Sequence, residues 1–194
     1  MRLTTLKMGL ATLIAAAPTL ALAHPGHEHS TSFMTGFMHP MGGLDHLLAM
    51  IAIGLWAASM GGKALWAVPA AFVGTMILGG AFGMAGMQVP FVEQGIALSV
   101  ILMGALLVAS VRFSVGTCAA IAGVFAFFHG AAHGMEMPLN AHVAEYALGF
   151  AAATALLHLV GMGMGKAIAC IEAPIVTRLS GGIIAAAGVV MAIA

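Results

Sequence analysis

The sequence predicts an all-α membrane protein, a bundle of six transmembrane helices that follows a cleaved signal peptide. Of the 194 residues, 62% are hydrophobic and only 6% are charged, against roughly 25% charged residues in a typical soluble domain. The chain also contains a series of apolar runs, each about long enough to cross a ~30 Å hydrocarbon core as a helix. Its formal charge of zero disfavours nucleic acid or an anionic lipid surface as the main partner. The low charged fraction indicates that the chain lies in the lipid bilayer.

Residues 1–23 have the pattern of a secretory signal peptide. Arg2 and Lys7 form a basic start, and an apolar stretch too short to span comfortably follows. A small-residue cleavage site at 21–23 would make His24 the first residue of the mature chain. An uncleaved seventh helix is the alternative, and both interpretations place residue 24 outside the cytoplasm.

The segment 24–38 is predicted to be a histidine-containing periplasmic extension. His24, His27 and His29, together with the α-amine that cleavage would free, form a ready chelator for a metal ion. A plain solvated linker is the alternative, since Pro25 and Gly26 suit a flexible or extended chain.

The remaining residues, 39–194, form the predicted transmembrane domain. Breaks containing Gly, Pro or Lys separate six spans at 42–60, 64–83, 92–112, 114–133, 142–163 and 175–193. If residue 24 lies outside, the cytoplasmic connections contain Lys63, Arg112 and Lys166, and Arg178 can snorkel to the same side. The pattern predicts a multi-pass protein of the bacterial inner membrane with a periplasmic mature N-terminus.

Two groups of polar residues lie at the outer ends of these spans. The first group, at the start of the first span, is His39, Asp45 and His46. The second group, at the end of the fourth span, is His129, His133 and Glu136, which follow one helical face at i, i+4 and i+7.

Spacing also suggests how the two groups would meet. His39, His46 and Met50 are at i, i+7 and i+11 and would share one helical face. Gly130 and Gly134 form a small-residue stripe that a neighbouring helix could approach closely. We therefore expect the two groups to form one site.

Other polar residues are candidates for additional metal or pathway roles. Glu93, His142 and Glu145 are predicted at outer ends of spans, whereas His158 lies about two thirds of the way across the fifth span. His158 is either an inner stop for an ion or a hydrogen-bonded core histidine.

A bound cation would explain the carboxylates in the outer leaflet. A carboxylate costs roughly 2.5–3.5 kcal/mol at the centre of a membrane and less near its surface. No Lys or Arg is expected at that depth to compensate Asp45, Glu93, Glu136 and Glu145. Imidazole and carboxylate ligands suit nickel, cobalt, zinc or copper(II). Solvation of these residues by headgroups and water is the alternative explanation.

The polar runs also resemble a known family. His39-Pro-x-x-Gly-x-Asp45-His46 and Phe128-His129-Gly-x-Ala-His133-Gly-x-Glu136 are similar to the two signatures of the HupE/UreJ family of hydrogenase and urease accessory membrane proteins. The resemblance implies a nickel permease that moves Ni²⁺, with Co²⁺ as a second candidate, from periplasm to cytoplasm. It implies no catalytic cofactor and no enzyme activity.

Two other classes of function stay open at this point. A His/His/carboxylate group can also activate water in an intramembrane metal-dependent hydrolase, and a metal-binding protein without transport would need no inward path. The sequence contains no nucleotide-binding motif such as a P-loop, which disfavours an ATP-driven pump. It makes no prediction of the oligomeric state.

Overall fold

The computed structural model describes residues 32–193, and every regular element within that range is an α-helix. The predicted signal peptide and His24, His27 and His29 lie outside the described residues. The helices are α2 (Ser32–Gly42), α3 (Leu44–Met60), α4 (Ala64–Met84), α5 (Val92–Ala109), α6 (Val115–Glu136), α7 (Val143–Cys170) and α8 (Pro174–Ile193).

The helices confirm the prediction of an all-helical chain built to cross a membrane. In the described range, five helices (α4 to α8) are individually long and apolar enough to span, and α2 with α3 passes the same test as a pair bent by 85°. The structure therefore has five candidate spans, or six if the bent pair is one span. Large apolar side chains such as Leu98, Leu148 and Ile183 are exposed on its surface, as expected for helices that face lipid.

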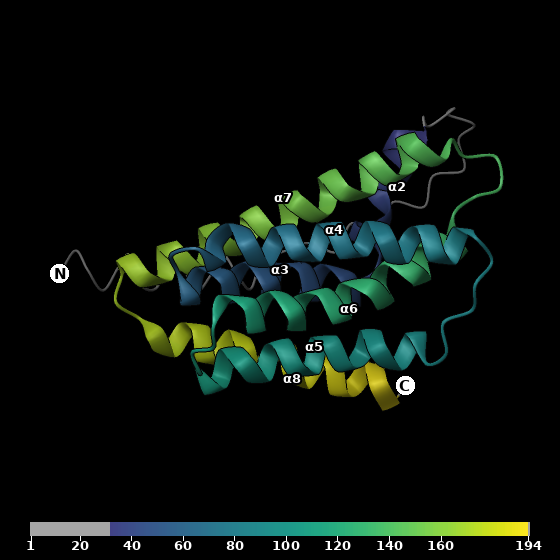
Figure 1. Cartoon of the computed structure of the whole chain (residues 1–194). Helices are drawn as coiled ribbons and strands as arrows, with labels where there is room; N and C mark the ends of the chain where they lie inside the picture. The colour runs from purple at the N-terminus through teal and green to yellow at the C-terminus, as the bar shows by residue number, and fades with distance from the viewer. Residues whose placement is uncertain (1–31, 194) are drawn as a thin grey trace.

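The long helices run side by side and alternate in direction, so that successive connections lie at opposite ends of the bundle (Figure 1). The α3–α4, α5–α6 and α7–α8 connections share the end drawn at the left, and the α4–α5 and α6–α7 connections share the other. The basic residues that the structure describes, Lys63, Arg112, Lys166 and Arg178, belong to the left end or its adjoining helical turns. Both predicted polar groups belong to the opposite end.

Helix α3 occupies the interior of the bundle and contacts α2, α4, α5, α7 and α8. Its residues 52–57 are all buried. A Cβ on Gly54 would collide with the backbone carbonyl of His158 on α7, and one on Gly161 would collide with that of Ile51. These glycines therefore let α3 and α7 approach backbone to backbone, as small residues do at membrane helix contacts.

The structure corrects the expected start of the first span. Helix α2 continues through His39 and Pro40 to Gly42, and the extended backbone of Gly43 separates it from α3. Residues 32–38, expected as part of an extension, are therefore helical. The prediction that His39, His46 and Met50 share one helical face is wrong, because the 85° bend lies between His39 and the other two.

Helix α2 is held against the start of α7 by two glycines. A Cβ on Gly36 would meet the carbonyl of Tyr146, and one on Gly149 would meet that of Phe33. Packing against α7 explains why these residues, which were compatible with a linker, form a helix. The rings of Phe33 and Phe37 also stack along this short helix, with centroids 6.1 Å apart. The same packing places His39 close to α7.

Two further expectations about the helices are corrected. Helix α7 extends to Cys170, beyond the expected end at residue 163, so Lys166 lies within a helix and not in a connection. The stripe of Gly130 and Gly134 packs against α4, where their Cβ atoms would collide with the carbonyls of Met76 and Gly80. The helix that carries Asp45 and His46 therefore does not use this stripe.

Candidate metal site

Three side chains from two helices form a group that could hold a metal ion. His39 at the end of α2 meets His133 and Glu136 in the last turns of α6, and one ligand atom from each lies within 4.8 Å of the others. His39 Nε2 lies 3.1 Å from Glu136 Oε2, and His133 Nδ1 lies 3.4 Å from the same oxygen. Two ligand atoms each about 2.1 Å from one ion are about 3.0–3.4 Å apart in octahedral or tetrahedral geometry. The two spacings to Glu136 Oε2, 3.1 and 3.4 Å, match that range.

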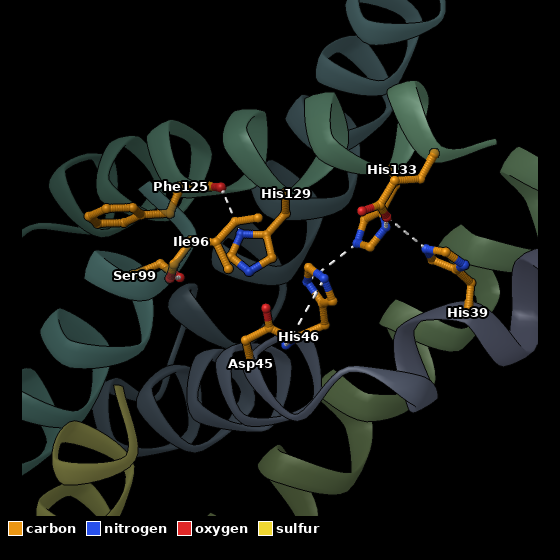
Figure 2. A network of polar contacts seen from close by, with 9 residues as sticks. His39, Asp45, His46, Ile96, Ser99, Phe125, His129 and His133 are labelled. Carbon is orange, nitrogen blue, oxygen red and sulfur yellow. Dashed lines mark hydrogen bonds and ion pairs between the residues drawn. The ribbon is translucent and has the colours of Figure 1, made fainter. Parts of the chain in front are cut away.

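His133 also connects this group to α3. Its Nε2 lies 3.3 Å from Nδ1 of His46 (Figure 2), while its Nδ1 faces Glu136. A neutral imidazole carries its proton on one nitrogen and a lone pair on the other. His133 can therefore direct a lone pair toward either the His39–Glu136 pair or His46, according to its tautomer.

Asp45 and His46 are oriented by the first turn of α3. The carboxylate of Asp45 accepts a hydrogen bond from the backbone N–H of His46 at 2.8 Å and lies 3.7 Å from its Nε2. A Cβ on Gly43 would come within 2.6 Å of the His46 ring and 2.7 Å of the Asp45 carboxylate. The missing side chain at the bend thus leaves room for both groups to face the site.

His129 lies one turn deeper on α6 than His133 and is fully buried. Its Nδ1 is 2.9 Å from the carbonyl oxygen of Phe125, which can only accept, so Nδ1 carries the proton. The lone pair is therefore on Nε2, which has no hydrogen-bond partner among the residues described. The rings of His129 and His46 are 5.2 Å apart (Figure 2).

An aromatic wall from α7 closes one side of the site. The ring of Phe150 is 4.3 Å from that of His133, and the ring of Tyr146 is 6.0 Å from that of His39. Neither residue belongs to the polar groups that the sequence predicts to form the site. Their spacing with Thr154 and His158 (i, i+4, i+8 and i+12) was the available signal, since it places all four near one face of α7.

The site opens to a cavity of about 630 Å³ at the end of the bundle opposite the basic residues, lined among others by His39, Asp45, His46 and Glu136. Asp45 also lines a second cavity of about 390 Å³, which contains Glu93 and Gln94. No Lys or Arg lines either cavity in the described part of the chain. A cation that entered either one would meet carboxylates, imidazoles or a neutral amide, without a competing basic side chain.

The other sequence candidates lie outside the three-residue group. Glu93 shares a cavity with Asp45, and that cavity is lined by none of the three residues of the group. His142 and Glu145 are exposed at the start of α7, and the His142 backbone N–H is bonded to Ser32 Oγ at 2.8 Å. His158 is buried deeper in the bundle, with 1% of its surface exposed.

Comparison with known proteins gives consistent results. A family model described as "HupE / UreJ protein" matches residues 11–191. The chain is 42% identical over 173 residues to "Protein HupE" of Rhizobium leguminosarum bv. viciae, covering 89% of this chain and 90% of that protein. No solved structure matches the chain.

Proposed function

Since the chain belongs to the HupE/UreJ family, we propose that it is a permease for a divalent transition metal, with Ni²⁺ the first candidate and Co²⁺ the second. The metal is cargo for the maturation of a hydrogenase or urease, and the chain itself performs no catalysis. One observation carries the proposal: the imidazole of His133 faces Glu136 through one nitrogen and His46 through the other. A site built for storage or structure needs no such two-sided ligand.

The arrangement suggests how an ion loses its water. In the outer cavity a hydrated ion would first exchange water for His39 Nε2, Glu136 Oε2 and His133 Nδ1. The Glu136 carboxylate offsets part of the ion's charge, as a site in a low-dielectric bundle requires. Ligands that replace the hydration shell stepwise make entry favourable without trapping the ion.

The next step of the proposed path runs through α3. A change of tautomer directs the His133 lone pair to the side of His46, where Asp45 supplies a second carboxylate. The free Nε2 of His129 lies beyond, next to the His46 ring. Transfer would thus proceed between neighbouring imidazoles and need no large helix movement.

Direction and location belong to the same proposal. The basic end of the bundle would face the cytoplasm, following the excess of Lys and Arg in cytoplasmic loops, and the metal group would face the periplasm. A cleaved signal peptide and a periplasmic N-terminus accord with this orientation. Glu93, His142, Glu145 and the N-terminal histidines His24, His27 and His29 would then attract or guide cations at the periplasmic face.

Uptake into proteoliposomes tests the proposal. Purified protein is reconstituted at known abundance, and entry of Ni²⁺, Co²⁺ and Zn²⁺ is measured against protein-free vesicles. We expect saturable Ni²⁺ entry, with Co²⁺ as the strongest competitor. Saturable binding to the protein without entry into the lumen would instead indicate a metal-binding protein that does not transport.

A further inference from the structure

A second histidine with unused nitrogens lies deeper in the bundle. Both ring nitrogens of His158 on α7 are buried and have no hydrogen-bond partner among residues 32–193. A buried polar group normally has a partner, and leaving it without one destabilises the folded state. A histidine kept only for packing could be replaced by an apolar ring that avoids this penalty, so the position calls for another explanation.

The surroundings of His158 place it in line with the outer site. The ring of Phe72 on α4 contacts both imidazoles, with its centroid 5.8 Å from that of His129 and 5.1 Å from that of His158. Helices α4 and α7 run in opposite directions (Figure 1). Phe72 precedes Met76 by one turn on α4, and His158 follows Thr154 by one turn on α7. The pair Phe72–His158 therefore lies one turn further from the outer end than the pair Met76–Thr154. His158 is thus the next imidazole inward after His129.

Two more weak metal ligands, one on α7 and one on α4, lie one turn from His158. Thr154, four residues before His158 on the same face of α7, donates its hydroxyl to the thioether of Met76 at 3.6 Å. Hydroxyl oxygen and thioether sulfur are neutral ligands, and neither this pair nor the ring contacts of His158 include a carboxylate. An ion at this depth would be held more weakly than at Glu136, which suits a stop on a path and not a storage site.

A cavity continues the line toward the basic end. About 250 Å³ of space lies between α3, α7 and α8, lined by Ser59, Gly165, Glu172 and Thr177 among others. Gly165 follows His158 by seven residues, two turns along the same face of α7. Glu172 provides the carboxylate that would draw a cation out of the apolar interior.

We propose that His158 is an inner metal-binding stop, at which a borderline divalent cation such as Ni²⁺ is held by imidazole between the outer His/Glu group and this inner cavity. The ring of Phe72 lies between His129 and His158. An ion that moves from His129 to His158 would pass this ring. This inference rests on the proposed function, since an inner stop has meaning only if the ion crosses the bundle.

The test replaces His158 with Phe, which preserves an aromatic ring against Phe72 and removes both lone pairs. Wild-type protein and His158→Phe are compared in proteoliposomes for Ni²⁺ uptake and in detergent for Ni²⁺ affinity by equilibrium dialysis. We expect unchanged affinity within about twofold, because the outer group is intact, a thermal midpoint equal to or above that of the wild type, and at least tenfold slower uptake. If the Phe ring prevents insertion, His158→Leu is used with the same expected result.

The outcomes separate the two proposals. Normal uptake by either inserted His158 variant would show that the residue serves packing and would remove the inner stop while leaving the permease intact. A tenfold loss of detergent affinity would place His158 in the outer site and also overturn the inner stop. Absence of uptake by the wild-type protein would remove the proposed function, and the inner stop with it.

Discussion

The backbone carbonyl of Met76 on α4 lies so close to Gly130 of α6 that a Cβ on this glycine would collide with it. Because α6 carries His129 and His133 in the same stretch, this contact fixes the depth and rotation of the candidate ligands. Reciprocal contacts extend it, since Gly79 and Gly83 of α4 lie against the carbonyls of Phe127 and Ala131. The positions of His133 and Glu136 in the three-residue group thus depend on the close approach of α4 and α6, which only glycine allows.

Gly130→Ala should therefore destabilise the protein. The new methyl group meets backbone atoms that cannot rotate away, and overpacking of this kind costs about 1–3 kcal/mol. At roughly 2–4 °C per kcal/mol for a chain of this size, the thermal midpoint in detergent should fall by several degrees. Gly74→Ala is the matched control on α4: its Cβ meets nothing within 4 Å, so its midpoint should be equal or higher. An equal loss in both variants would contradict the packing argument.

Orientation in the membrane can be tested with topology reporters. Because Lys63, Arg112, Lys166 and Arg178 belong to one end of the bundle, reporters fused after Gly62 or Glu172 should read as cytoplasmic. Fusions after Gly86 or Asn140 should read as periplasmic. The second cytoplasmic reporter follows Glu172 and not residue 163, the expected end of the fifth span, because α7 continues to Cys170. A periplasmic signal after Glu172 would contradict the orientation.

The sequence predicted the helices and the polar groups because both are local properties. Hydropathy marks each span, and the i, i+4, i+7 spacing of His129, His133 and Glu136 places them near one face of a single helix. The bend at Gly43 could not be predicted from spacing, since His39, His46 and Met50 also fit one continuous helix. The contact of α2 with α7, through Gly36 and Gly149, decided the outcome.

Residue spacing did not predict which helices pack against one another. A GxxxG stripe indicates that some helix approaches closely but does not identify it. Helix α4 packs there because its own glycines, Gly79 and Gly83, lie against the backbone of α6. The aromatic wall of Tyr146 and Phe150 was missed for a related reason. Aromatic residues at helical spacing in an apolar chain usually pack in the core, so only the position of α7 beside His39 and His133 gives them a role.

The N-terminal histidines lie outside the described residues, and their contribution needs a separate experiment. If His24, His27 and His29 only capture ions, replacing all three with Ala should reduce uptake when Ni²⁺ is scarce, because fewer ions are concentrated near the outer cavity. Uptake at saturating Ni²⁺ should be nearly unchanged. The measurement is initial uptake rate against Ni²⁺ concentration, and complete loss at every concentration would make the segment part of the transport site itself.

Matched pairs at the end of the bundle opposite the basic residues separate ligands from surface residues. His39 and His142 are both near the start of α7, but only His39 lies 3.1 Å from Glu136; Glu136 and Glu145 are both exposed carboxylates, but only Glu136 contacts two imidazoles. We expect His39→Ala and Glu136→Gln each to abolish uptake and to weaken Ni²⁺ binding by at least about 10–100-fold, the loss seen when only a partner that orients a metal ligand is removed.

The corresponding controls, His142→Ala and Glu145→Gln, should keep Ni²⁺ affinity within about twofold, since rim charges act mainly on the rate of encounter. His133→Ala should bind as weakly as Glu136→Gln, and Asp45→Asn should lose uptake with a smaller loss of binding, because Asp45 acts after the first three ligands. Affinity is measured by equilibrium dialysis in detergent and uptake at matched membrane abundance. Normal uptake by His133→Ala would contradict the role of the three-residue group, and normal uptake by Asp45→Asn would contradict the proposed step through α3. Equal losses in the paired controls would reduce the result to a general effect of surface charge.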